Sequence, residues 1–478
     1  MAARRLAFPQ VKQFASPGEL TDRLAALGVE LPVDGSVDPT GVLSGPLDVA
    51  DSARSLRIPH RFAILPMEGW DAEPDGMPSD LVRRRWRRFG SSGAGLIWGG
   101  EAAAVRHDGR ANPNQLVIDD ATTVAVGSLR SELMAAADEV GVTPIVGLQL
   151  THSGRFSRPD GDPAPRIARR DPVLDERVGA TDASLLSDDE LDELVATYVH
   201  AASLAHDAGF DFVDVKACHG YLGHELLMAF DRPGRYGGDL EGRTRFLRSV
   251  VDGIRTSVPA MAIGVRLSLF DPGPLHAGAD GTAEKVPGAA ATFGPVGDDG
   301  RPDLAEPVAV VGMLAEAGVR LVCTTASSPY WAPSVQRPAW FPPSDGALPV
   351  RDPLIDAAVM LAAARDLRAA SPSGTVVVGT GFTYFQQHVP EVGQALVAAG
   401  WVDSVGLGRM VLSYPDLPAD VLVGRPLVAR KVCRTFSDCT TAPRNGLVSG
   451  CYPLDPFYKD SPQRVELAAI KKSMRGTT

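Results

Sequence analysis

Short apolar runs alternate along this sequence with longer segments of helical periodicity. The apolar runs have the length of buried strands and predict strands at residues 62–66, 95–98, 144–150, 212–216, 262–267, 321–324, 375–379 and 404–406. Helices are predicted between them, at residues 80–89, 121–140, 188–208, 243–257, 306–317, 353–370 and 390–399. Gly209, Gly318 and Gly400 each follow a predicted helix, as C-cap glycines do.

This regular alternation predicts an α/β fold with a parallel sheet. The strands are apolar almost throughout, which favours a closed (β/α)8 TIM barrel over an open doubly wound sheet. No predicted strand is followed by GxGxxG or GxxxxGK[ST], so the open dinucleotide-binding alternative is weakened. In a barrel the chemistry belongs at the carboxyl ends of the strands, where Gln149, Lys216 and Arg266 lie.

Three parts of the chain are predicted. Residues 1–54 show little periodicity and form an N-terminal extension, residues 55–430 form the barrel, and residues 431–478 form a tail packed on it. Two long βα loops are expected, at residues 271–302 and 326–350. The second is too rich in proline for regular structure, but its aromatic residues suit a lid that faces the substrate.

Charge and composition narrow the functional classes. The formal net charge of −11 argues against nucleic acid or an anionic membrane as partner. No apolar run reaches the roughly 18–20 residues of a membrane helix, and the first residues lack the pattern of a signal peptide. The five cysteines are scattered, unlike a disulfide framework. We therefore expect a cytoplasmic protein that acts on a small molecule; its oligomeric state stays open.

Residues 211–246 carry the densest group of reactive side chains. Lys216 ends the strand predicted at 212–216, and His219 and Tyr221 follow it closely. A basic group, an imidazole and a phenol in one pocket can anchor a carbonyl-type oxygen and deliver a proton. Taken singly, each residue is more often structural. Their clustering at a strand end favours an active site.

Seven motifs in order carry a resemblance to a known family. They are LPMEGWD (65–71), SSGAGLIWGGEAAAVRHDGR (91–110), GLQLTHSGR (147–155), ACHGYL (217–222), RYGGDLEGRTRFL (235–247), GVRLS (264–268) and GWVDSVGLGR (400–409). With them the chain resembles the old yellow enzyme family, FMN-dependent oxidoreductases on a (β/α)8 barrel. It is most similar to the larger members, of the dienoyl-CoA reductase and amine dehydrogenase type.

The resemblance implies FMN as cofactor, with NADPH or NADH as reductant. Gln149 would pair with the polar edge of the flavin ring, and Arg266 would stabilise the charge near N1. The residues that would pass beside the ring by backbone are Pro66, Met67 and Glu68. Those that would hold the phosphate are Gly379, Thr380, Gly381, Phe382, Gly408 and Arg409.

The implied reaction is hydride transfer from the nicotinamide through flavin N5 to an activated alkene, an α,β-unsaturated carbonyl compound. Tyr221 matches the family's proton donor and His219 one of its two carbonyl anchors. Amine or N-methyl dehydrogenation is the alternative within flavin chemistry. A lyase that uses Lys216 without redox chemistry is the alternative from another class.

The sequence departs from the family at two neighbouring roles. Lys216 stands where the family has His or Tyr, and an ammonium suits an acidic substrate. Glu68 replaces Thr or Cys, and we predict that it forms an ion pair with Lys216. The aromatic and basic residues of the predicted lid that are candidates for substrate contact are Tyr330, Trp331 and Arg337.

The cysteines of the tail differ from the iron–sulfur signature of the larger relatives. Cys439 and Cys451 have its last spacing, but Val432 and Thr435 stand where its earlier cysteines would be. Cys433 does not stand at a cysteine position of that signature. We therefore expect FMN alone, with no iron–sulfur cluster and no other metal.

Overall fold

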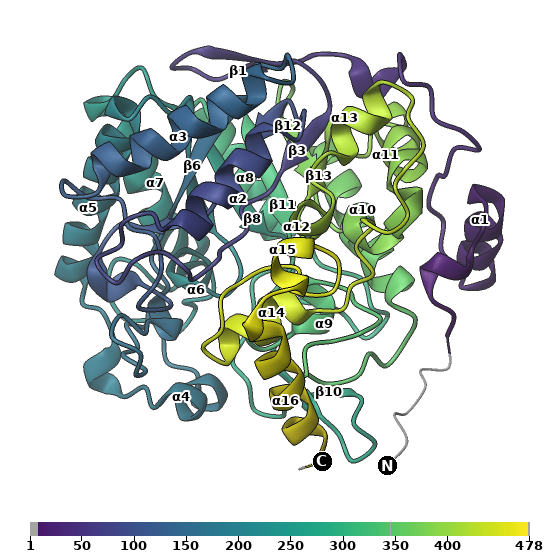
Figure 1. Cartoon of the computed structure of the whole chain (residues 1–478). Coiled ribbons are helices and arrows are strands. Elements are labelled where there is room, and N and C mark those ends of the chain that lie inside the picture. Colours follow the sequence, from purple (N-terminus) through teal and green to yellow (C-terminus); the bar gives the residue numbers. More distant parts are fainter. Residues whose placement is uncertain (1–7, 345, 477–478) are drawn as a thin grey trace.

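A closed barrel of parallel strands forms the centre of the computed structural model, which describes residues 8–344 and 346–476 (Figure 1). The strand order is β4-β3-β13-β12-β11-β8-β7-β6-β5, and a further β4–β6 pairing closes the ring. The predicted (β/α)8 barrel is confirmed. Its strands are β3 (Phe62–Ile64), β4 (Leu96–Ile97), β5 (Ala102–Ala104), β6 (Ile145–Thr151), β7 (Phe212–Ala217), β8 (Ala262–Ser268), β11 (Leu321–Thr325), β12 (Val376–Gly379) and β13 (Ser404–Leu407).

One position of the barrel is shared by two short strands. β4 and β5 both pair with β6, through Leu96 opposite Ile145 and Ala102 opposite Gln149. The glycines between them permit a close approach, since a Cβ on Gly99 would lie 2.8 Å from the backbone nitrogen of Gln149. Three successive alanines have little strand preference, so β5 was not predicted.

Helices surround the barrel, and each of the seven predicted ones is present. They are α2 (Asp80–Gly90), α3 (Thr123–Asp138), α5 (Asp188–Asp207), α7 (Leu240–Ser257), α8 (Ala305–Glu316), α10 (Pro353–Ala370) and α11 (Val389–Ala398). Their starts carry strong caps: Ser187 and Glu190 form a capping box at α5, and the Asp239 side chain accepts from Gly242 N–H at α7. Apolar faces of these helices are buried against the strands.

The amino end of the barrel is closed by an antiparallel hairpin, β1 (Leu47–Ala50) with β2 (Ser55–Ile58). Its inward side chains cluster with Trp98 and Phe212 inside the barrel. The hairpin spans the boundary predicted after residue 54, and α1 (Pro17–Ala26) precedes it in the part predicted to lack periodicity. With this end filled, the carboxyl ends of the strands remain for the site.

The two long loops contain more regular structure than expected. The first carries the hairpin of β9 (Leu275–Ala277) and β10 (Ala283–Lys285). Residues 326–350 are here called the lid segment. They contain one short helix, α9 (Pro333–Gln336), so the expectation of no regular structure there is wrong. Its residue 345 lies outside the described residues. The other short helices before the end of the barrel are α4 (Pro172–Val178) and α6 (Leu222–Leu227).

The chain after β13 returns across the carboxyl end of the barrel (Figure 1). The hydroxyls of Thr435 and Thr441 accept from the backbone N–H groups of Trp340 and Ser344, at 3.2 and 3.3 Å. The tail and the lid segment thus form one cap. The helices of this part are α12 (Met410–Ser413), α13 (Leu417–Leu422), α14 (Asp438–Arg444), α15 (Pro456–Lys459) and α16 (Pro462–Gly476). Across the described ranges, no helix has the length and apolarity needed to cross a membrane.

Candidate active site

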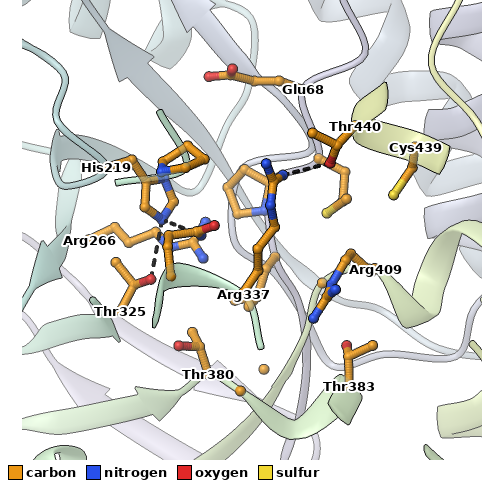
Figure 2. A pocket seen from close by; sticks show the side chains of 18 of the residues that line it. Glu68, His219, Arg266, Thr325, Arg337, Thr380, Thr383, Arg409, Cys439 and Thr440 are labelled. Atoms are coloured by element: carbon orange, nitrogen blue, oxygen red, sulfur yellow. Dashed lines mark hydrogen bonds between the residues drawn. The ribbon is translucent and has the colours of Figure 1, made fainter. Parts of the chain in front are cut away.

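A pocket of about 1210 Å³, part of it open to solvent, lies between the carboxyl ends of the strands and this cap (Figure 2). The structure brings most of the predicted site residues to its wall. They are Pro66, Met67, Glu68, Gln149, Lys216, His219, Tyr221, Arg266, Tyr330, Arg337, Thr380, Gly381, Gly408 and Arg409.

Three predicted residues are not part of this wall. Gly379 ends β12, where a Cβ would lie 2.6 Å from Val402 Cγ1, so the glycine serves close packing. Phe382 is fully buried in the core. Trp331 is buried too, and its Nε1 donates to the Asp271 carboxylate at 3.1 Å. Phe382 and Trp331 therefore belong to the core around the pocket rather than to its wall.

Lys216 and Glu68 form the predicted ion pair. Lys216 Nζ lies 2.7 Å from Glu68 Oε1, and the two side chains are 3% and 19% exposed. The ammonium also lies over the ring of Tyr221, 3.9 Å from its centroid. Lys216 comes from β7, whereas Glu68 follows β3, so the pair links distant parts of the rim.

The Tyr221 hydroxyl stands between two polar groups. It donates to Glu68 Oε2 at 3.0 Å and lies 2.9 Å from the hydroxyl of Tyr330. Burial, followed by the charge of Glu68, raises the pKa of Tyr221 well above its ordinary value. The Tyr330 ring is held in turn by Phe156, which stacks on it at 3.8 Å between centroids.

His219 has a left-handed backbone, φ +66°, which its N–H to Ser268 Oγ supports at 3.1 Å. Its Nε2 lies 3.2 Å from both Thr325 Oγ1 and Gln336 Nε2 (Figure 2). Burial, and then the charges of Arg266 and Lys216, lower the pKa of His219 well below 6.5. The imidazole is therefore neutral near pH 7 and acts by hydrogen bonding rather than by charge.

Asp214 organises the inner wall of the pocket. Its carboxylate accepts from Gln149 Nε2 at 2.5 Å, from Trp98 Nε1 at 2.7 Å and from the Arg266 backbone at 2.7 Å. Burial raises the pKa of Asp214 to about 6. One N–H of the Gln149 amide is thus committed within the protein. By contrast, Arg266 Nε is buried with no hydrogen-bond partner among the described residues.

The opposite end of the pocket suits a phosphate. Arg409 Nη2 donates to the Pro338 carbonyl at 2.6 Å, while its buried Nη1 has no partner within residues 8–344 and 346–476. Gly381, at φ +100°, and Gly408 leave room for close backbone approach. Figure 2 shows the Arg409 guanidinium beside Thr383. Unsatisfied guanidinium nitrogens at both ends fit a long polar cofactor with an anionic tail and a ring that gains negative charge on reduction, as FMN has.

Several wall residues were not predicted. Thr325 is the last residue of β11. Its position at the carboxyl end of a strand could have predicted it, as the same position predicted Lys216. Gln336 comes from α9, and α14 contributes Cys439, Thr440, Pro443 and Arg444. Nothing local in the sequence marks these positions. In the described part of the chain, no group of three or more His, Cys, Asp or Glu side chains is arranged to hold a metal.

A closed barrel whose carboxyl end carries these groups belongs to the class of barrel oxidoreductases that hold a flavin. Comparison with known families identifies the particular one. The model of the NADH:flavin oxidoreductase / NADH oxidase family matches residues 45–290, just over half of the chain. The chain belongs to this FMN-dependent family.

Curated relatives match only part of the chain. It is 29% identical over 208 residues to an NADPH dehydrogenase of Bacillus subtilis, covering 42% of this chain and 57% of that protein. It is 27% identical over 300 residues to the putative 12-oxophytodienoate reductase 2 of Oryza sativa subsp. japonica, covering 59% and 63%. The chain thus spans less than two thirds of the length of these relatives.

Solved structures share the fold at low identity. A 2-naphthoyl-CoA reductase complex superimposes with a TM-score of 0.64 at 18% identity, covering 87% of this chain and 57% of that chain. Histamine dehydrogenase from Rhizobium sp. 4-9 gives 0.63 at 20%, covering 88% and 53%. At such identities the likeness shows the barrel alone.

Proposed function

We propose that the protein is an FMN-dependent oxidoreductase that reduces the double bond of a small α,β-unsaturated carbonyl compound with NADPH or NADH. The observation that carries the proposal is that His219, Lys216 and Tyr221 face one pocket whose far end presents the Arg409 guanidinium. Relatives named NADPH dehydrogenase and 12-oxophytodienoate reductase support it. A cytoplasmic location belongs to the same proposal.

The residues of the pocket divide between cofactor and substrate. Arg409, Gly408, Thr380 and Gly381 would hold the FMN phosphate, and Arg266 and Gln149 the polar edge of the ring. When bound, FMN supplies hydride transfer between nicotinamide and substrate. As a neutral imidazole His219 would donate its one hydrogen to the substrate oxygen from Nδ1, because Gln336 Nε2 can only donate to its Nε2.

Lys216 adds charge beside the substrate oxygen, and Tyr221 delivers the proton to carbon.

Amine oxidation is the second candidate. A carboxylate in the pocket, Glu68, would attract a cationic amine, and its side chain is 19% exposed. Lys216 already pairs with it, however, which leaves less charge for such a substrate. The same pair disfavours a Schiff-base lyase, because Lys216 Nζ is already bonded to Glu68 Oε1 at 2.7 Å.

The test begins with the colour of the protein. We expect purified protein to bind FMN, to be bleached anaerobically by NADPH or NADH and to be reoxidised by 2-cyclohexen-1-one. Arg409→Met removes a charged hydrogen-bond donor to the phosphate and should weaken FMN binding roughly 10- to 100-fold.

The matched control is Arg57→Met on β2, whose Nη1 bonds only Asp48 at the surface in the described residues, and it should bind FMN normally. A protein that stays colourless after addition of FMN would refute the proposal. Bleaching by an amine but not by a nicotinamide would favour the second candidate.

A further inference from the structure

Hydrogen-bond direction is fixed at the Tyr221 hydroxyl. This group has one hydrogen, and it donates that hydrogen to Glu68 Oε2 at 3.0 Å. Glu68 is paired with the Lys216 ammonium, and an ionised carboxylate only accepts. The contact of 2.9 Å between the hydroxyls of Tyr221 and Tyr330 must therefore be donated by Tyr330. The order of donation is Tyr330 to Tyr221 to Glu68.

A phenolate on Tyr221 would be poorly placed. If Tyr221 gave its proton to substrate carbon and kept the charge, two negative groups would lie 3.0 Å apart in a site where Tyr221 is 3% exposed. The Lys216 ammonium offsets part of this repulsion, but it is already bonded to the same carboxylate. A second proton source would relieve the repulsion.

Tyr330 is better placed to carry that charge. It lies beyond Tyr221 from Glu68, and it is partly exposed on the pocket wall. Burial, and then the charge of Glu68, raise the pKa of Tyr330, while the charges of Arg444 and Arg337 act in the opposite direction and favour the phenolate. Arg444 is held close by its bond of 2.6 Å to the carbonyl of Pro329, the neighbour of Tyr330.

We propose that Tyr330 is the second member of a two-tyrosine proton relay, an inference that rests on the proposed alkene reduction. The Tyr221 O–H bond breaks as the new C–H bond forms at the substrate α-carbon. The Tyr330 O–H bond breaks as that of Tyr221 is restored. The negative charge moves to Tyr330, which regains a proton from water in the open part of the pocket.

The geometry is prepared for this transfer. Stacking on Phe156 fixes the Tyr330 ring, and the cation–π contact with Lys216 fixes that of Tyr221. Tyr330 acts through Tyr221 and touches no reacting carbon, so it is a positioning and relay residue. Because Tyr330 belongs to the lid segment, that segment supplies the second member of the relay.

A nitroalkene separates the two steps of the reaction. Hydride addition to 1-nitrocyclohexene leaves a nitronate anion, which persists in water and absorbs in the ultraviolet, so hydride transfer and protonation are observed separately. In Tyr330→Phe, the ring and its stacking remain. We expect unchanged FMN reduction by NADPH, unchanged nitronate formation and an approximately 10- to 100-fold slower enzymatic protonation of the nitronate. The solvent deuterium isotope effect on that protonation should change as well.

Tyr452→Phe is the matched control. Its hydroxyl also donates one hydrogen bond, to the Val448 carbonyl at 2.7 Å, but it lies outside the pocket wall. It should protonate the nitronate at the wild-type rate. A wild-type rate in Tyr330→Phe as well would overturn the relay and leave the proposed function intact. Absence of both the nitronate and its protonated product, nitrocyclohexane, with the wild-type protein would overturn the proposed reduction and the relay together.

Discussion

Two groups of lysine, carboxylate and tyrosine in this protein share their contacts but differ in burial. In the pocket, Lys216 bonds Glu68 at 2.7 Å and lies 3.9 Å over the Tyr221 ring. Outside it, Lys431 bonds Asp416 at 2.7 Å and lies 5.3 Å over the Tyr414 ring. The side chains are 3% and 19% exposed in the first pair, and 36% and 40% in the second.

The two tyrosines differ in what donates to them. Tyr414 donates to Asp420 Oδ2 at 2.6 Å and accepts from the Val428 backbone N–H at 3.0 Å. A backbone amide cannot give up its proton, so the role of the Tyr414 hydroxyl is structural only. Tyr221 has the same arrangement, but its donor is the phenol of Tyr330. The exchange of one donor separates a structural contact from one that can transfer protons.

The largest expected difference concerns stability. Glu68→Gln leaves the buried Lys216 without its counter-charge, which should cost about 3–5 kcal/mol in the free energy of unfolding. Asp416→Asn removes an exposed partner and should cost about 0–1 kcal/mol. Urea unfolding at saturating FMN measures both. The double variant Glu68→Gln with Lys216→Met should recover much of the loss, whereas equal costs in the two single variants would abolish the comparison.

A smaller effect is expected from reversing both charges. Glu68→Lys combined with Lys216→Glu keeps an ion pair in the pocket, so it should retain about 10-fold more reduction of 2-cyclohexen-1-one than either single variant. The surface counterpart, Lys431→Asp with Asp416→Lys, should stay within about twofold of wild type. If all three pocket variants lose activity equally, the pair contributes no charge-specific function.

An effect confined to alkaline pH is expected at Tyr414. Burial, and then the bond to Asp420, raise its pKa to about 12 from 10. Above pH 10 the unfolded chain releases this proton while the folded chain keeps it, so the free energy of unfolding falls as the pH rises from 10 to 12. In Tyr414→Phe this part of the decline should disappear. Unfolding curves that remain parallel to wild type would show that Tyr414 does not contribute.

The barrel could be predicted because its strands are buried on both faces and therefore read as continuous apolar runs. Elements that depend on tertiary contacts could not. The tail helix α15 is an example. Arg84 Nη2 of α2 bonds Oδ1 and Oδ2 of Asp455, at the start of α15, at 3.0 and 2.9 Å, and no local periodicity predicts this contact. The hairpin β1–β2 is short and half polar, so it too escaped prediction.

The site was predictable to the extent that it follows strand ends. Lys216, Arg266 and Gln149 reach the pocket because parallel strands place their last residues on one rim. Gln336 and Thr440 reach it because the lid segment and the tail dock on each other, which depends on contacts such as Thr435 with Trp340.

The wall of the pocket begins at Leu65 and ends at Arg444, so its parts are synthesised far apart in time. On a ribosome that adds about 5–20 residues per second, β3 emerges well before α14. A flavin can therefore be fully enclosed in this pocket only after α14 has been synthesised.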